Sequence, residues 1–383
     1  MTKRIIALIC AVIISLLILP SALADGAPAN SARSVILMHA DTGTVIYEEN
    51  ADERMLIAST TKIMTALVAL ENCPPDEIIT VRREDVLVEG SSMYLKQGEQ
   101  YTLLELIYGL LLVSGNDAAL CIANHIGGSV AGFADLMNAR AQQMGLSNTS
   151  FKNPHGLDAE GHFSTSRDLA SIMSEAMKNN VFAEITKTKQ IVIKDLTYVN
   201  HNKLLWNYDG MVGGKTGYTM AAGRSLVSCA ERDGMRLICV TLGDPDDWSD
   251  HTDLYNWAFD AYVFKDALPM GEYSRIPVIS GDADTVGVAP EGNLRIFVKR
   301  SSEFKVRLEL PRFVYADVRE GQTAGSAAII EDGKIVGSVN LRYTESVGVG
   351  KGIRLTPWER FTKAWYLANS YGPIVNYGYY SFF

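Results

Sequence analysis

Three short groups of residues carry side chains that together could perform nucleophilic acyl transfer. They are Ser59-Thr60-Thr61-Lys62, Ser114-Gly115-Asn116 and Lys215-Thr216-Gly217. A serine hydroxyl is a poor nucleophile on its own and needs a base within hydrogen-bonding reach. On a helix, residues three apart share a face, so Lys62 can reach the hydroxyl of Ser59. The pattern predicts a serine nucleophile whose base is a lysine.

A lysine can act as that base only if its amine is uncharged. An apolar helix and a second nearby cation both disfavour the charged form, and Lys215 is the candidate for that second cation. Acyl transfer also needs hydrogen-bond donors for the oxygen that becomes negative. We expect these donors to be the backbone N–H of Ser59, at a helix N-terminus, and the backbone N–H of Tyr218.

The other two motifs are expected to line the cleft that receives the substrate. Ser114 lies on a predicted loop between two helices, where its hydroxyl could relay a proton to the leaving amine. Asn116 could bond both Lys62 and a substrate amide. We predict that residues 215–217 belong to an edge strand, and that Gly217 lacks a side chain so that the substrate backbone can approach closely.

Each motif taken alone has an ordinary structural alternative. Ser59 could simply cap a helix, residues 114–116 could form a turn, and residues 215–217 could be a surface strand. Similar patterns occur at Ser302-Glu303-Phe304-Lys305 and Ser338-Val339-Asn340, but on alternating strand sequence with no Lys-Thr-Gly after them. Motif matches gain weight from their context. The three motifs occur in order, each on the expected kind of element, which favours the functional interpretation.

The segments around the motifs predict an α+β fold in which helices pack on an antiparallel sheet. Two β-rich runs, 34–38 and 43–47, come first, and residues 224–242 return to strand–turn–strand. Helical patterns lie between them, over residues 58–70, 103–113, 118–126 and 166–179. We therefore expect the sheet to be assembled from both ends of a domain that spans residues 25–270.

The first 24 residues read as a secretory signal peptide. Lys3 and Arg4 precede an apolar run over residues 5–19, and small residues follow, which predicts cleavage after Ala24. The alternative is an uncleaved anchor, but a spanning helix needs about 20 apolar residues and this run is shorter. We predict an exported protein.

The C-terminal part differs from the rest of the chain. Short alternating strands over residues 271–352 predict a small all-β domain. In the tail, residues 353–383, the spacing of Trp358, Phe361 and Trp365 places three aromatic rings on one helix face. Such a helix can lie in the lipid headgroup layer, so we expect the tail to bind a membrane surface. The alternative is that the helix docks on its own β domain.

Composition excludes several classes of function. The formal net charge of −9 and pI near 5.3 argue against a nucleic-acid partner, which would require a basic surface. The six histidines are scattered, with no zinc-peptidase spacing, so we expect no metal and no cofactor. Four cysteines follow residue 24 with no Cys-x-x-Cys pair, and we expect free, buried thiols. They are Cys73, Cys121, Cys229 and Cys239.

With these motifs the chain resembles the low-molecular-mass penicillin-binding proteins, the D-alanyl-D-alanine carboxypeptidases of the S11 serine peptidase family. The resemblance covers essentially the whole chain and includes further segments. These are Gly90-Ser91-Ser92-Met93-Tyr94-Leu95, Asn153-Pro154-His155-Gly156-Leu157-Asp158 and Lys215-Thr216-Gly217-Tyr218-Thr219 with Ala222-Gly223. It implies a β-lactamase/transpeptidase-like domain, a peptidoglycan stem peptide ending in D-Ala-D-Ala as substrate, and β-lactam antibiotics as covalent inhibitors.

The resemblance also implies roles for individual residues. Ser59 becomes the acylated nucleophile and Lys62 its base, while Ser114, Asn116, Lys215 and Thr216 complete the cleft. In some members an arginine after the strand that ends here at Leu242-Gly243 helps to bind the terminal carboxylate of the substrate. In this sequence Trp248 falls at that position. We expect Lys215, Thr216 and Thr219 to bind the carboxylate without it.

Three other functions remain as alternatives. A β-lactamase shares the serine and lysine but needs an extra base, typically a glutamate in a Glu-x-x-Leu-Asn segment, and residues 117–214 contain none. A DD-endopeptidase that cuts cross-links would use the same residues. A non-catalytic envelope protein that binds peptidoglycan would not need the serine, both lysines and the asparagine together. The sequence favours a carboxypeptidase on the extracytoplasmic side of the membrane, in cell wall biosynthesis.

Overall fold

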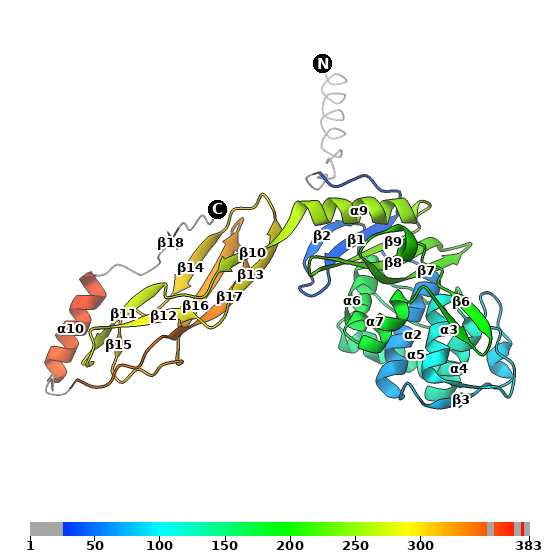
Figure 1. Ribbon diagram of the computed structural model, residues 1–383, viewed down its shortest axis with the longest axis horizontal. Coiled ribbons are helices and arrows are strands. Elements are labelled where there is room, and N and C mark those ends of the chain that lie inside the picture. Colours follow the sequence, from blue (N-terminus) through cyan, green and yellow to red (C-terminus); the bar gives the residue numbers. More distant parts are fainter. Residues whose placement is uncertain (1–25, 351–355, 371–376, 379–383) are drawn as a thin grey trace, which may run out of the picture. The chain divides into compact units, whose positions relative to one another are not determined.

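The computed structural model describes residues 26–350, 356–370 and 377–378 (Figure 1). The chain divides into two compact units, of which the first ends at Phe259 and the second begins at Asp260. The predicted signal peptide, residues 1–24, lies outside the described residues.

An antiparallel sheet organises the first unit, and within the described residues it has five strands in the order β2-β1-β9-β8-β7. Its strands are β1 (Ser34–His39), β2 (Val45–Glu49), β7 (Met211–Thr219), β8 (Gly223–Arg232) and β9 (Met235–Leu242). Because β1 pairs with β9, the sheet joins both ends of the unit, as predicted from the sequence. β7 is the edge strand, which agrees with the expectation for residues 215–217.

Helices cover both faces of this sheet (Figure 1). They are η1 (Ala58–Thr61), α2 (Lys62–Asn72), η2 (Glu84–Val86), α3 (Leu103–Leu112), α4 (Asn116–Ile126), α5 (Val130–Gln143), α6 (Ser166–Met177), α7 (Asn180–Lys187), α8 (Leu204–Asn207) and α9 (Asp247–Ala261). Two short antiparallel strand pairs accompany them, formed by β3 (Ile78–Thr80) with β4 (Gln100–Thr102) and by β5 (Gln190–Ile193) with β6 (Leu196–Val199). This arrangement is the α+β fold that the sequence predicts.

The alternation of side chains along β8 and β9 separates the two faces of the sheet. Cys229 joins the main apolar core, which the α2, α3 and α6 helices share. On the opposite face, the Tyr255 hydroxyl of α9 accepts a hydrogen bond from the backbone N–H of Cys239 and contacts the Ser228 hydroxyl. The four cysteines after residue 24 are all free and buried, as predicted.

Helix α2 lies at the centre of the first unit. Every residue from Lys62 to Ala69 is buried, so the helix is surrounded on all sides rather than amphipathic. It ends at Cys73, whose backbone is extended. A lysine at the start of such a helix is enclosed by apolar neighbours, which is the environment that disfavours its charged form.

The second unit is mainly β structure. Its described part contains a seven-stranded sheet and a separate pair of strands. The strands are β10 (Tyr262–Leu268), β11 (Ser274–Ile279), β12 (Thr285–Pro290), β13 (Leu294–Lys299), β14 (Lys305–Glu309), β15 (Val314–Tyr315), β16 (Thr323–Glu331), β17 (Lys334–Tyr343) and β18 (Tyr377–Gly378). Because β10 pairs with β13, this unit begins before the boundary at residue 270 that the sequence suggested. Helix α10 (Pro357–Ser370) follows β17.

Candidate active site

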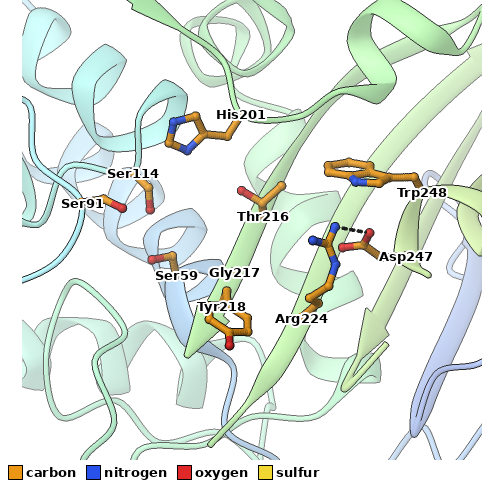
Figure 2. A pocket seen from close by; sticks show the side chains of 10 residues that line it. All are labelled: Ser59, Ser91, Ser114, His201, Thr216, Gly217, Tyr218, Arg224, Asp247 and Trp248. Carbon is orange, nitrogen blue, oxygen red and sulfur yellow. Dashed lines mark hydrogen bonds and ion pairs between the residues drawn. The ribbon is translucent and has the colours of Figure 1, made fainter. Parts of the chain in front are cut away.

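Ser59 lies in the single turn of 3-10 helix, η1, that leads into α2. This turn is held by side chains of its own, since the Thr60 hydroxyl donates to the Ile57 carbonyl at 2.6 Å and the Thr61 hydroxyl donates to the Ala58 carbonyl at 2.9 Å. Ala58 has a φ of +46°, which is unfavourable for a residue with a side chain and indicates local strain. The N-cap residues of η1 and α2 are Ile57 and Thr61, so Ser59 caps neither helix, and its side chain lines a pocket (Figure 2).

The amine of Lys62 is buried against the Ser59 hydroxyl. Its Nζ lies 2.9 Å from Ser59 Oγ, 2.7 Å from Asn116 Oδ1 and 2.5 Å from the carbonyl oxygen of His155. The side chain is 0% exposed. Burial, and secondly the charge of Lys215, hold the pKa of Lys62 well below its ordinary value. Lowering the pKa favours the neutral form of the amine, which can accept the proton of the neighbouring hydroxyl.

Asn116, the first residue of α4, positions this amine. Its side-chain oxygen accepts from Lys62, and its Nδ2 donates to the carbonyl of Glu89 at 2.7 Å. Gly90 allows the Glu89 carbonyl to come so near, because a Cβ at that position would lie 2.8 Å from Nδ2. The sequence predicted contacts from Asn116 to Lys62 and to a substrate amide; the structure provides the first and directs the amide nitrogen to Glu89.

Ser114 sits between α3 and α4, on the predicted loop. Its φ is +62°, so the backbone is in the left-handed region that turns the side chain toward the pocket. The residue is 3% exposed, and its hydroxyl has no hydrogen-bond partner within the described structure. Buried hydroxyl groups are normally paired, so an unpaired one at a pocket is suited to bond a ligand.

Lys215 lies inside the edge strand β7 and is 1% exposed. Its Nζ donates to the carbonyl of Thr216 at 2.7 Å, and burial lowers its pKa to about 7. The lysine therefore stands behind the pocket wall and acts on Lys62 through its charge. Thr216 and Tyr218, the neighbours along the strand, both line the pocket.

Gly217 lines the pocket and has a further role that the sequence did not suggest. A Cβ on this residue would lie 3.1 Å from the Ile57 carbonyl oxygen, the Ser59 backbone nitrogen and the Ala58 Cβ. The missing side chain thus lets β7 approach the turn that carries Ser59. This close contact brings the backbone of β7 next to Ser59.

Thr219 does not belong to the described pocket lining. Its hydroxyl donates to the Asp158 carboxylate at 3.0 Å and accepts from the backbone N–H of Ala222, which closes the turn between β7 and β8. The expectation that Thr219 binds the substrate carboxylate therefore has no geometric support.

The pocket has a volume of about 320 Å³. It is lined by Ser59, Ser91, Ser114, His201, Thr216, Gly217, Tyr218, Arg224, Asp247 and Trp248 (Figure 2). Sequence reasoning missed five of these as site residues, namely Ser91, His201, Arg224, Asp247 and Trp248. Ser91 lies inside a segment that resembles the family, and Arg224 directly follows another. Nothing in the local sequence distinguishes His201 and Asp247.

Two polar residues beside the motifs have structural roles. Asp117, next to Asn116, accepts hydrogen bonds from the Ser92 hydroxyl and from the backbone N–H groups of Met93 and Leu95. It thereby fixes the segment that carries Ser91. The His155 ring accepts from the backbone N–H of Leu157, and burial lowers its pKa to about 3. It holds the loop whose carbonyl bonds Lys62. Among the described residues, no cluster of metal-binding side chains occurs.

Comparison with known proteins places these residues in a family. A family model described as D-alanyl-D-alanine carboxypeptidase matches residues 21–246. The D-alanyl-D-alanine carboxypeptidase DacF of Bacillus subtilis is 31% identical over 87% of this chain and 92% of its own length. DacC of Escherichia coli is 34% identical over 85% of this chain and 86% of its own. The crystal structure of penicillin-binding protein 5 from Haemophilus influenzae, 31% identical, covers 84% of this chain and 98% of its own with a TM-score of 0.71. The chain therefore belongs to the S11 family of D-alanyl-D-alanine carboxypeptidases.

Proposed function

We propose that this protein is a serine-type carboxypeptidase that removes the terminal D-alanine from peptidoglycan stem pentapeptides through an acyl-Ser59 intermediate. The observation that carries the proposal is the buried amine of Lys62, which lies 2.9 Å from a serine hydroxyl that lines a pocket. Membership of the D-alanyl-D-alanine carboxypeptidase family supplies the substrate class.

In the first half-reaction, the Ser59 hydroxyl gives its proton to the neutral amine of Lys62 while Oγ bonds to the carbonyl carbon of the penultimate D-alanine. The carbonyl oxygen becomes negative, and the backbone N–H groups of Ser59 and Tyr218 are proposed to stabilise it. The C–N bond to the terminal D-alanine then breaks. The proton held by Lys62 reaches the leaving amine through the unpaired hydroxyl of Ser114.

In the second half-reaction, a water molecule gives a proton to the Lys62 amine and its oxygen bonds to the acyl carbon. The C–O bond to Ser59 then breaks, and Lys62 returns the proton to Oγ. The products are a tetrapeptide and free D-alanine, and the enzyme regains its starting protonation. A β-lactam would follow only the first half-reaction readily, because the chain lacks the glutamate segment that a β-lactamase uses for the second.

The direct test is digestion of a stem pentapeptide that ends in D-Ala-D-Ala, scored by mass. We expect loss of one D-alanine, together with stable labelling of the protein by a fluorescent penicillin. Rapid turnover of the drug without release of D-alanine would assign the chain to the β-lactamases instead. Cleavage of cross-linked peptides but not of the pentapeptide would assign an endopeptidase.

Gly156 offers a test of how closely the Ser59 turn must be held. Its φ is +90°, and a Cβ there would lie 1.9 Å from the carbonyl oxygen of Ala58. The variant Gly156→Ala must displace Ala58 and with it Ser59. Because small displacements of reacting groups are costly, we expect the rate of labelling by a fluorescent penicillin to fall about tenfold or more.

The matched control is Gly145→Ala. Gly145 has a φ of +74° but no atom within 4 Å of its Cβ position, so this variant carries the backbone strain, about 1–2 kcal/mol, without the clash. It should lower the melting temperature and leave the labelling rate unchanged. Equal labelling rates in the two variants would contradict the proposed role of the turn.

We also propose that the enzyme works outside the cytoplasmic membrane and binds its surface through α10. Trp358, Phe361 and Trp365 on this helix are 70%, 57% and 61% exposed, although the helix contacts β11. Exposed aromatic rings on one helix face favour an interfacial location. Export rests on the predicted signal peptide. In the described part of the chain, no helix has the length and apolar character needed to cross a bilayer.

Truncation tests this location. A chain that starts after residue 24 and ends before Leu355 should release D-alanine at the rate of the chain that retains the tail. It should no longer sediment with vesicles of phosphatidylethanolamine and phosphatidylglycerol, whereas the longer chain should. If the two chains sediment equally, α10 is not the membrane-binding element.

A further inference from the structure

The pocket beside Ser59 has a charged end that the sequence motifs do not account for. Figure 2 shows Ser59, Ser91 and Ser114 on one side of β7, and Arg224, Asp247 and Trp248 on the other. The strand backbone at residues 216–217 separates the two groups. A ligand attacked by Ser59 would therefore have to cross β7 at residues 216–217 to reach Arg224.

Arg224 is fixed by its surroundings but remains accessible. It is the second residue of β8 and pairs with Tyr218 of β7 in the sheet. One of its terminal nitrogens donates to Asp247 at 2.5 Å, and the guanidinium lies 5.6 Å from the centre of the Trp248 ring. The side chain is 42% exposed, whereas that of Asp247 is only 3% exposed. The carboxylate thus sits behind the guanidinium and leaves it facing the pocket.

The hydrogen-bonding capacity of this guanidinium is mostly unused. It carries five N–H donors, and the Asp247 bond uses one nitrogen. Nε is buried and has no partner within the described structure. Arginine binds carboxylates well because its planar donors match two oxygens at once. The guanidinium could therefore donate further hydrogen bonds to an anionic group at this end of the pocket.

The other lining residues cannot supply this charge. Burial, and secondly Lys215, lower the pKa of His201, so its ring is neutral near pH 7. Lys215 is not among the residues that line the pocket, and its amine donates to the Thr216 carbonyl. Among the described residues that line the pocket, Arg224 is the one with a permanent positive charge.

We propose that Arg224, held in place by Asp247 and Trp248, binds the free α-carboxylate of the C-terminal D-alanine and makes the enzyme select peptides with a free C-terminus. This inference rests on the proposed function and names the group that sets its specificity. It also explains why the enzyme tolerates Trp248 at the position where other members carry an arginine. The indole supports a guanidinium that β8 supplies instead.

The test measures binding rather than turnover. In Ser59→Ala protein, which cannot form the acyl-enzyme, the dissociation constants of a peptide ending in D-Ala-D-Ala and of its C-terminal amide are measured by calorimetry. The acid should bind about tenfold or more tightly than the amide, because charge-assisted hydrogen bonds to a carboxylate are lost in the amide. Adding Arg224→Gln should reduce the ratio of the two dissociation constants to about one, mainly by weakening the binding of the acid.

Two further variants separate charge from structure. Arg224→Lys keeps the charge but not the paired donors, so the ratio should be intermediate. Arg232→Gln, at the far end of β8 and outside the pocket, should leave the ratio unchanged. The inference is wrong if the Arg224→Gln protein still binds the acid more tightly than the amide. It is also wrong if the substitution weakens binding of the acid and of the amide by the same factor. If the ratio behaves as stated but the wild type releases no D-alanine, the proposed function fails while the carboxylate site stands.

Discussion

The Ser59→Ala variant is expected to release D-alanine at least about 10⁴-fold more slowly than the wild type. Removing the nucleophile of a serine hydrolase leaves only the contributions of binding and oxyanion stabilisation, and losses of this size or larger are typical. The variant should also fail to form a covalent adduct with a fluorescent penicillin. Release of D-alanine is followed by mass, and the adduct by gel fluorescence.

Ser302→Ala is the natural control for this experiment. Ser302 begins the second Ser-x-x-Lys pattern of the chain, but its backbone bonds Lys299 and Lys265, and Lys305 lies on strand β14 of the second unit. The variant should keep wild-type activity and labelling. Full labelling of the Ser59→Ala protein would instead move the acylation site to another residue and remove the basis of the mechanism.

The second large effect is expected for Lys62→Met. Methionine has a similar length and is apolar, but it cannot accept a proton, so acylation should fall about 10²–10⁴-fold, the usual contribution of general-base catalysis. The exposed Lys305→Met, at the matching position of the second pattern, should leave acylation unchanged. The comparison is made from the rate of penicillin labelling at pH 7.

Lys62→Met should also change how stability depends on pH. The pKa of Lys62 is lowered in the folded protein, so below the ordinary lysine pKa the unfolded chain binds a proton that the folded chain does not. The free energy of unfolding of the wild type therefore falls as the pH drops from about 10.4, the unperturbed lysine pKa, toward the lowered pKa of Lys62. The free energy of unfolding of the variant does not fall for this reason, because methionine does not titrate.

The difference in melting temperature, variant minus wild type, should consequently increase as the pH is lowered from 10 to 7. The lost hydrogen bonds to Asn116 and to the His155 carbonyl change the size of this difference but not its direction with pH. A difference that stays constant over this range would mean that Lys62 is charged in the folded protein. It could then not serve as the base.

The sequence was sufficient to predict the fold class and several of the residues that meet at the pocket. Ser59 and Lys62 lie one helical turn apart, and that contact is set by helix geometry alone. The α+β arrangement followed from β-rich runs at both ends of the first unit with helices between them. Ser114 on a loop and Lys215 on an edge strand followed from local patterns in the same way.

Other features depend on contacts between residues far apart in the chain. Gly217 was expected to let the substrate approach, and the structure adds that it lets β7 pack closely on the Ser59 turn. Thr219 was expected at the carboxylate and closes a turn with Ala222 instead. Neither outcome could be read from the sequence, because each depends on which strand lies against which turn.

Arg224 illustrates the same limit most clearly. The family resemblance suggested a cation at position 248, where this sequence has a tryptophan. The register of β8 against β7 and the start of α9 nevertheless bring Arg224, Asp247 and Trp248 into one cluster. The sequence by itself determined that the Ser59 hydroxyl and the Lys62 amine lie together, since periodicity governs contacts within one helical turn. Only the tertiary structure decided the charge at the other end of the pocket, since that depends on strand register and helix packing between distant segments.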